Sequence, residues 1–182
     1  MTTSIDVLAY LHARYQTTGR LQRQKLLYFS QAWHLAWFGT PLFSDPVTAW
    51  ENGPVVRSAW RVDKTWAENP IQGFNLTQDE QNTIDAIMAF YGHMNGSQLR
   101  DLTHAEGPWV KNYVEVSSFV KGSMVIEMSE MRNYCTELTL SGDNVPQRPA
   151  SMPETIDEAM FHSILGTELN RWSKTLELLA DR

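Results

Sequence analysis

One helix that is apolar on nearly every side constrains the fold of this chain more than any other feature. Residues 21–38 have helical spacing, and their apolar residues form a stripe and then widen it almost all the way round: Leu26, Phe29, Trp33, Trp37, Leu27, Ala32, Leu35 and Ala36. A helix with this pattern is buried on most sides. Gly39 and Pro41 predict its end, so we expect the other elements to pack around residues 21–38.

The remaining sequence predicts more helices and a little strand. Helix starts are expected where capping or turn residues precede apolar periodicity: Ser4, the Asn52-Gly53-Pro54 turn, Thr77 with Glu80, Ser97 and Ser129. Short strands are expected near residues 46–51 and 123–127. The predicted fold class is mainly α, a compact multi-helix domain around a buried central helix. A small two- or three-stranded β element and a C-terminal helical extension complete it.

Glycine and proline mark one predicted boundary. Residues 139–153 hold Gly142, Pro146, Pro149 and Pro153, a composition typical of a linker. We therefore expect a helical domain over residues 1–138, a linker over 139–153 and a helical extension over 154–182.

The extension carries an apolar stripe with coiled-coil spacing. Its members follow one another at intervals of four and three residues: Leu165, Leu169, Trp172, Leu176 and Leu179. Two heptads are too few to hold a helix pair without further support, so the stripe is expected to pack on something. Its own domain, a partner helix and a second copy of the chain are the alternatives, and the five residues are candidate partner-binding residues.

Charge and composition limit the classes of partner. The formal net charge is -6 and the Lys and Arg residues are scattered, which disfavours nucleic-acid binding. No signal peptide and no apolar run long enough to cross a membrane are evident. The single cysteine, Cys135, suits a reducing compartment. These features predict a cytoplasmic protein without a membrane partner.

Catalytic and metal-binding motifs are missing from the sequence. Phosphate-binding glycine loops, a nucleophile elbow, HExxH and paired histidines at metal-ligand spacing are all absent. His34, on the most buried helix, predicts a hydrogen-bonded core residue. His104 near Glu106 could support acid–base chemistry, and the alternative is that Thr103 and His104 satisfy backbone groups at a helix end. The sequence predicts no catalytic residue, no metal and no cofactor.

Three separated motifs of the sequence carry a resemblance to a known family. The first comprises Leu21-Gln22, Gln24–Tyr28, Gln31–Leu35, Gly39 and Pro41–Phe43, the second Ala49-Trp50 and Gly53–Val55, and the third Thr103–Trp109. Together they resemble the Panacea domain, also called the antitoxin SocA-like domain. The resemblance extends over roughly residues 5–138, and Arg23 departs from the more compact pattern of typical members. The motif residues are interpreted as structural: Lys25, Tyr28, Gln31, Trp33, His34, Trp50, Gly53, Pro54, His104, Glu106, Gly107, Pro108 and Trp109. The three tryptophans among them are expected to form a joint core.

The resemblance implies a bacterial or phage protein of the toxin–antitoxin type. Many members of the family neutralise a cognate protein toxin by direct binding, and the resemblance implies the same function for this chain. One alternative is a proteolytic adaptor, with a Clp-type protease as a further partner, or a phage-encoded interaction protein acting on a host defence or protease component. A third hypothesis is a hydrolytic enzyme using His104 and Glu106. The apolar stripe of the extension is also compatible with a homo-oligomer.

Overall fold

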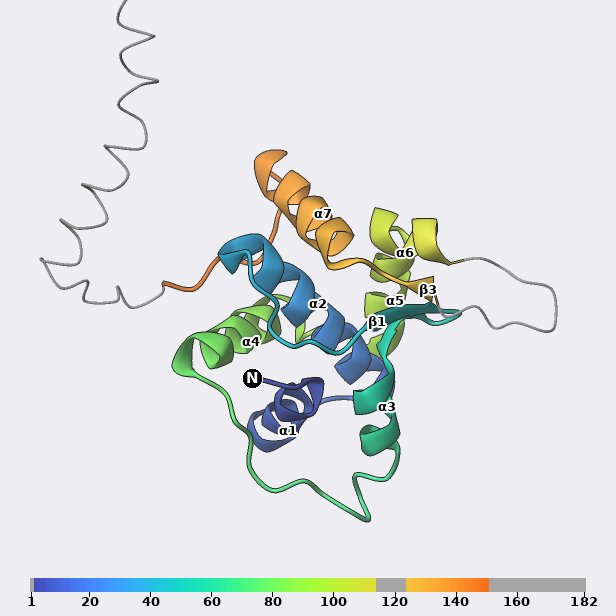
Figure 1. The fold of residues 1–182 in the computed structure, drawn as a ribbon, viewed down its shortest axis with the longest axis vertical. Coiled ribbons are helices and arrows are strands. Elements are labelled where there is room, and N and C mark those ends of the chain that lie inside the picture. The colour runs from blue at the N-terminus through green and yellow to red at the C-terminus, as the bar shows by residue number, and fades with distance from the viewer. Residues whose placement is uncertain (1, 114–123, 151–182) are drawn as a thin grey trace, which may run out of the picture. The chain divides into compact units, whose positions relative to one another are not determined.

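The computed structural model describes residues 2–113 and 124–150. All of them except Ala150 belong to one compact unit, Met1–Pro149. The C-terminal extension and its leucine stripe lie outside the described residues. The elements in chain order are α1 (Ser4–Arg14), α2 (Arg20–Phe38), β1 (Val47–Trp50), β2 (Gly53–Val56), α3 (Arg57–Lys64), α4 (Gln78–Tyr91), α5 (Gly96–His104), α6 (Gly107–Asn112), β3 (Met124–Val125) and α7 (Met128–Leu140) (Figure 1). The predicted mainly α fold with a small sheet is confirmed.

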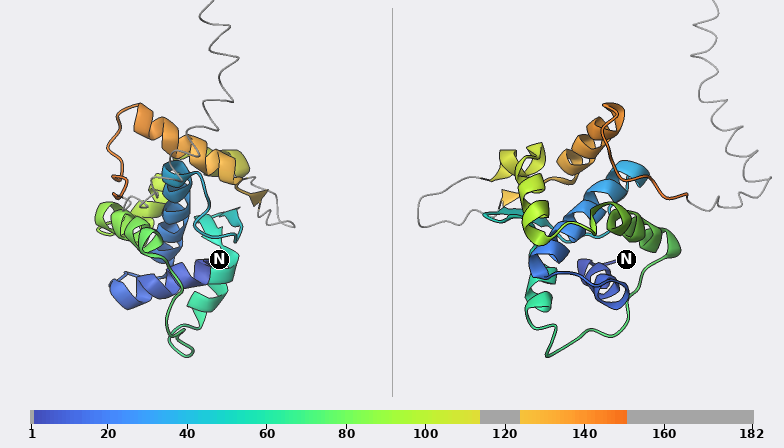
Figure 2. Two further views of the ribbon diagram at one scale, coloured as in Figure 1. Left: turned by 60° about the vertical axis from the view of Figure 1, so that its left-hand side comes forward. Right: turned by 180° about the vertical axis from the view of Figure 1, so that it is seen from behind.

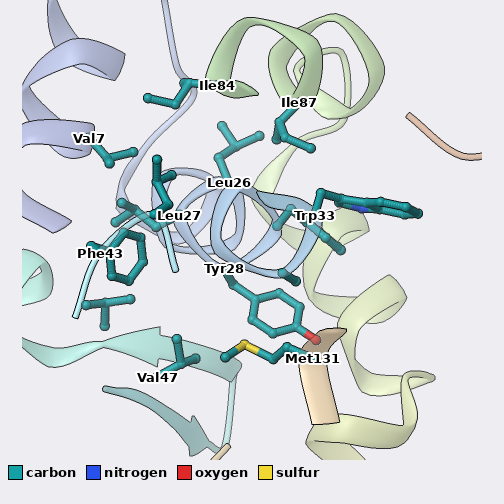
Figure 3. Close-up of a cluster of buried hydrophobic side chains, with 14 of the residues drawn as sticks. Val7, Leu26, Leu27, Tyr28, Trp33, Phe43, Val47, Ile84, Ile87 and Met131 are labelled. Atoms are coloured by element: carbon teal, nitrogen blue, oxygen red, sulfur yellow. The ribbon is translucent and has the colours of Figure 1, made fainter. Parts of the chain in front are cut away.

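Helix α2 is the centre of this unit. It packs against α1, α3, α4, α5, α7 and β2, and the views in Figure 2 show it crossing between them. Leu26, Leu27 and Trp33 are 0% exposed. Figure 3 shows side chains from other elements around α2, with Val7, Ile84, Ile87, Phe43, Val47 and Met131 on different sides. The predicted buried central helix is confirmed, because its apolar residues face partners in nearly every direction.

The sheet contains three antiparallel strands in the order β2-β1-β3. Trp50 pairs with Gly53 across a two-residue turn, and Thr48 pairs with Val125 on the other side. The prediction that Pro54 opens a helix is wrong, because Pro54 lies in β2 and α3 begins at Arg57. Side chains of α2 hold this segment extended: Gln24 Oε1 accepts from the Val56 amide at 3.0 Å, and Lys25 Nζ donates to the Pro54 carbonyl at 2.9 Å.

Capping residues explain where several helices begin. The predicted capping box of Thr77 and Glu80 is confirmed at the start of α4. Asn95 forms a further box with Gln98 at the start of α5. The cap of α1 is Thr3 rather than the predicted Ser4. Ser4 is buried instead, and its amide donates to Asp45 Oδ2 at 3.0 Å. A carboxylate distant in sequence therefore accepts from one of the free amides at the start of α1.

The three motif tryptophans do not all reach the core. Trp33 and Trp109 are buried among the core residues, as expected. Trp50 is only half-buried, and its ring meets Trp60 edge-on at 6.1 Å. Trp109 is connected to Trp50 through the backbone, because its indole Nε1 donates to the Trp50 carbonyl at 2.9 Å. The expectation of a joint core is therefore wrong for Trp50, which lies on the sheet near the surface.

Candidate functional site

The motif residues of α2 place polar side chains inside the protein. Gln22, Gln24, Lys25, Gln31 and His34 are all buried. A buried polar group costs free energy unless it is hydrogen-bonded, so each of these side chains needs a partner. The partners come from the segments that pack around α2, and most of them are backbone groups.

Gln31 holds the loop that follows α2. Its Oε1 accepts from the amides of Leu42 and Phe43 at 2.9 and 3.1 Å, and its Nε2 donates to the Phe43 carbonyl at 2.9 Å. Gln22 holds the connection between α4 and α5, because its Nε2 donates to the Met94 carbonyl at 2.7 Å. Two glutamines of one helix therefore fix two loops that are far apart in sequence.

Lys25 is buried, and no carboxylate of the described residues forms an ion pair with it. Its side chain is 0% exposed, and its Nζ donates to the Pro54 carbonyl. Burial, and then the positive charge of Arg100, lower the pKa of Lys25 to about 7. Gly53 makes this arrangement possible, because a Cβ atom at that position would lie 2.8 Å from Lys25 Nζ and 2.8 Å from Thr103 Oγ1. Lys25 thus joins α2 to the β1–β2 hairpin, which lies against α5.

Glu106 is the second buried titratable group. It precedes α6, is 5% exposed, and accepts a hydrogen bond at 2.7 Å from the hydroxyl of Tyr28. Burial raises the pKa of Glu106 to about 7. Burial and the nearby Glu106 charge also raise the pKa of Cys135, whose thiol is buried on α7. A thiol in this environment is not a reactive thiolate.

His104 lies in a stack of three rings rather than beside Glu106. Its ring is 3.9 Å from that of Trp109 with 7° between the planes, and Trp109 stacks in turn on Tyr113 at 4.6 Å. Burial, followed by the charges of Lys25 and Arg100, lowers the pKa of His104, which favours the neutral imidazole. Among the residues that the structure describes, no hydrogen bond joins His104 to Glu106. The structure therefore does not assemble the acid–base pair that the sequence left open.

The other motif residues also contact the protein interior. His34 Nδ1 lies 3.1 Å from Thr83 Oγ1, and burial lowers the pKa of His34. Thr103 Oγ1 donates to the Arg100 carbonyl at 2.9 Å, which satisfies a backbone group at the end of α5. Gly107 and Pro108 occupy the first turn of α6, where the missing amide hydrogen of proline is no loss. No group of three or more His, Cys, Asp or Glu side chains in residues 2–113 and 124–150 could hold a metal ion.

The raised pKa of Glu106 predicts a specific pH dependence of stability. Its ordinary value is 4.5 and its folded value about 7, so the folded chain binds the proton more tightly than the unfolded chain. The contribution of this group is complete below pH 4.5 and is lost as the pH rises through 7. Relative to wild type, Glu106→Gln should therefore gain about 3 kcal/mol of unfolding free energy between pH 4 and pH 8.

Denaturant titrations at the two pH values measure this difference. Glu137→Gln provides the matched control, because Glu137 is exposed on α7 and should change stability by the same small amount at both pH values. Lys25 makes the stability of both proteins rise as the pH increases above about 7, because its pKa is lowered from 10.5 to about 7. This change is the same in wild type and variant, so it cancels in the comparison. Parallel pH profiles for Glu106→Gln and wild type would contradict a buried, protonated Glu106.

Two further clusters were not predicted from the sequence. Asp63 is buried on α3 and bonds both Arg23 and His12. On the outer side of the same helix, Arg57 and Arg61 are exposed at a spacing of four residues. That spacing is visible in the sequence, so the exposed pair could have been found, whereas the partners of Asp63 come from α1 and α2.

Comparisons with known proteins agree with the motifs. Residues 24–110 match the family model described as the antitoxin SocA-like Panacea domain, and this span contains all the motif residues from Lys25 to Trp109. The predicted resemblance is thereby confirmed. The chain is also similar to Antitoxin SocA of Caulobacter vibrioides (strain NA1000 / CB15N), with 29% identity over 106 residues. The alignment covers 49% of this chain and 56% of that relative. No solved structure matches the chain.

Proposed function

Since this chain carries the Panacea domain of the antitoxin SocA-like family over residues 24–110, we propose that it is an antitoxin that binds and neutralises a cognate protein toxin. We propose the cytoplasm as its site of action. Among the described helices, none combines the length and the apolar character that crossing a bilayer requires.

One observation supports binding over catalysis. The polar motif residues Lys25, Gln31 and Glu106 are buried, and each hydrogen-bonds to a group inside the protein. A catalytic base or nucleophile must reach a substrate within hydrogen-bond distance, and these groups face backbone carbonyls, amides and a tyrosine. The motif therefore acts as a scaffold that fixes the hairpin and the α5–α6 turn, and recognition is left to exposed residues.

Co-expression with the products of the adjacent genes tests this function. We expect one of them to arrest growth when expressed alone, and we expect this chain to restore growth and to co-purify with it. A partner whose cellular level falls only when a Clp-type protease is present would instead indicate an adaptor. If neither neighbouring product is toxic or binds, the proposal is wrong for this chain.

We further propose that the C-terminal stripe of residues 165–179 contributes to partner choice. Trp172→Ala with Leu176→Ala removes two central members of the stripe, so the double variant should abolish growth rescue, because large apolar side chains dominate interface energies. Asn170→Ala with Lys174→Ala changes the opposite side of the same predicted helix and is the matched control. Rescue and gel filtration are the measurements. Full rescue by the first variant would exclude the stripe from partner binding, and a change in its elution volume alone would indicate a homo-oligomer.

A further inference from the structure

Helix α3 presents an exposed row of cations. Arg57, Arg61 and Lys64 are spaced by four and three residues, so they share one face of the helix, and all three are exposed. The acidic residue of α3, Asp63, is buried and bonds Arg23 of α2. The opposite side of α3 packs against α1, α2 and β2 (Figure 1). The outward face is therefore positive in a chain whose net charge is -6.

These cations have no carboxylate partner within the described ranges. The ion pairs found in residues 2–113 and 124–150 involve His12, Arg23, Arg100 and Lys111 as the cations. Glu51 and Glu68 are exposed on the adjoining turns, and neither forms an ion pair with the row. Like charges at a spacing of three or four residues destabilise a helix. The helix dipole offsets part of this cost, because Arg61 and Lys64 lie in the last turn of α3.

Half-buried tryptophans adjoin the row. The guanidinium of Arg20 lies 4.8 Å over the ring of Trp60, and Trp50 meets that ring edge-on. Trp60 follows Arg57 by three residues and so lies beside the cations on α3. Tryptophan and arginine are the residues that contribute most to protein–protein binding energy. We call Arg20, Arg57, Trp60, Arg61 and Lys64 the α3 face.

We propose that the α3 face docks an acidic segment of a protein partner, which is the cognate toxin if the proposed function is correct. Its exposed cations would gain opposite charges, and Trp60 would gain apolar cover. A nucleic acid fits less well. The four cations of the α3 face can neutralise only a few phosphates. The net negative charge of the chain repels the remaining phosphates of a nucleic acid. Trp60 is also covered by Arg20 on a ring face, whereas single-strand binders offer open ring faces for bases.

Charge reversal on α3 tests the docking. The full-length chain is titrated with the purified product of the adjacent toxin gene, and Arg61→Glu and Arg57→Glu with Arg61→Glu are compared with wild type. Arg132→Glu is the matched control, because Arg132 is exposed on α7 and belongs to none of the ion pairs above. We expect roughly a tenfold loss of affinity for the single α3 variant and a larger loss for the double variant. The control should bind as wild type does.

Salt and nucleic-acid titrations complete the test. Added salt should weaken wild-type binding more than that of the double variant, because exposed charges are screened. Circular dichroism should show all variants folded, since every substitution is at an exposed position. Wild-type affinity for the Arg57/Arg61 variant would overturn the α3 face and leave the antitoxin function intact. No binding by wild type contradicts the function and the docking together. Tighter binding to transfer RNA than to the protein, lost in Arg61→Glu, would assign the face to nucleic acid.

Discussion

Gly53→Ala is expected to lower the free energy of unfolding by roughly 3 kcal/mol, because two costs coincide at this position. Gly53 has a φ of +89°, a conformation that costs an L-residue roughly 1 to 2 kcal/mol. The added methyl group would also lie 2.8 Å from both Lys25 Nζ and Thr103 Oγ1, and overpacking a buried site costs roughly 1 to 3 kcal/mol. Lys25 cannot move away cheaply, since it would lose its hydrogen bond to the Pro54 carbonyl.

Gly73→Ala separates the two costs. Gly73 has a similar φ of +78°, and nothing lies within 4 Å of the position that an added methyl group would take. Chemical denaturation should therefore show a loss of only about 1 kcal/mol for Gly73→Ala. Equal losses for the two variants would mean that the close approach of Lys25 and Thr103 to Gly53 contributes nothing. A weaker growth rescue by Gly53→Ala alone would connect this contact to the binding function.

The sequence predicted the central helix well, because its signal is local. The apolar periodicity of residues 21–38 reports directly which side chains avoid water, and Gly39 ends α2 with a φ of +74°. The capping box of Thr77 and Glu80 was equally predictable, since all its atoms lie within four residues. Signals of this kind need no knowledge of what packs against the segment.

The errors arose where distant partners decide the conformation. Asn52-Gly53-Pro54 has the composition of a turn that opens a helix, yet Gln24 and Lys25 of α2 bind the backbone of residues 54 and 56 and hold it as a strand. Ser4 is a residue type typical of a helix cap, yet it is buried and its amide donates a hydrogen bond to Asp45. Both outcomes depend on hydrogen bonds to residues about 30 to 40 positions away in the sequence. The intrinsic preference of a residue for helix or strand contains no information about such contacts.

The candidate sites were also predictable where the signal is local and unpredictable where distant partners decide. The motif residues were found because they resemble a known family. The burial of Lys25, Gln31 and Glu106 could not be predicted from the sequence, since lysine, glutamine and glutamate are usually exposed. Lys25 is 0% exposed only because the Pro54 carbonyl lies within reach of its ammonium group. Asp63 and Ala59 are both buried on α3. The partners of Asp63 on α1 and α2 were not predictable.

Asp63→Ala is expected to lower the free energy of unfolding by roughly 4 kcal/mol, because Asp63 neutralises a buried polar cluster. Its carboxylate is 0% exposed and accepts from Arg23 Nε at 3.0 and 3.1 Å. His12 Nε2 lies 3.0 Å from the same group, and the His12 ring stacks on Trp66 at 3.9 Å. Removing one partner of a buried pair leaves the other charge unpaired, which costs roughly 3 to 5 kcal/mol.

Asp101→Ala distinguishes this buried cluster from an ordinary surface pair. Asp101 also bonds an arginine, Arg100, at 2.6 Å, but its side chain is 65% exposed. Solvent screening should therefore limit the loss for Asp101→Ala to less than about 1 kcal/mol. Replacing Asp63 by leucine together with Arg23 by methionine should recover part of the stability, since no unpaired guanidinium remains. Equal unfolding energies for Asp63→Ala and Asp101→Ala would show that the cluster does not hold α3 against α1 and α2.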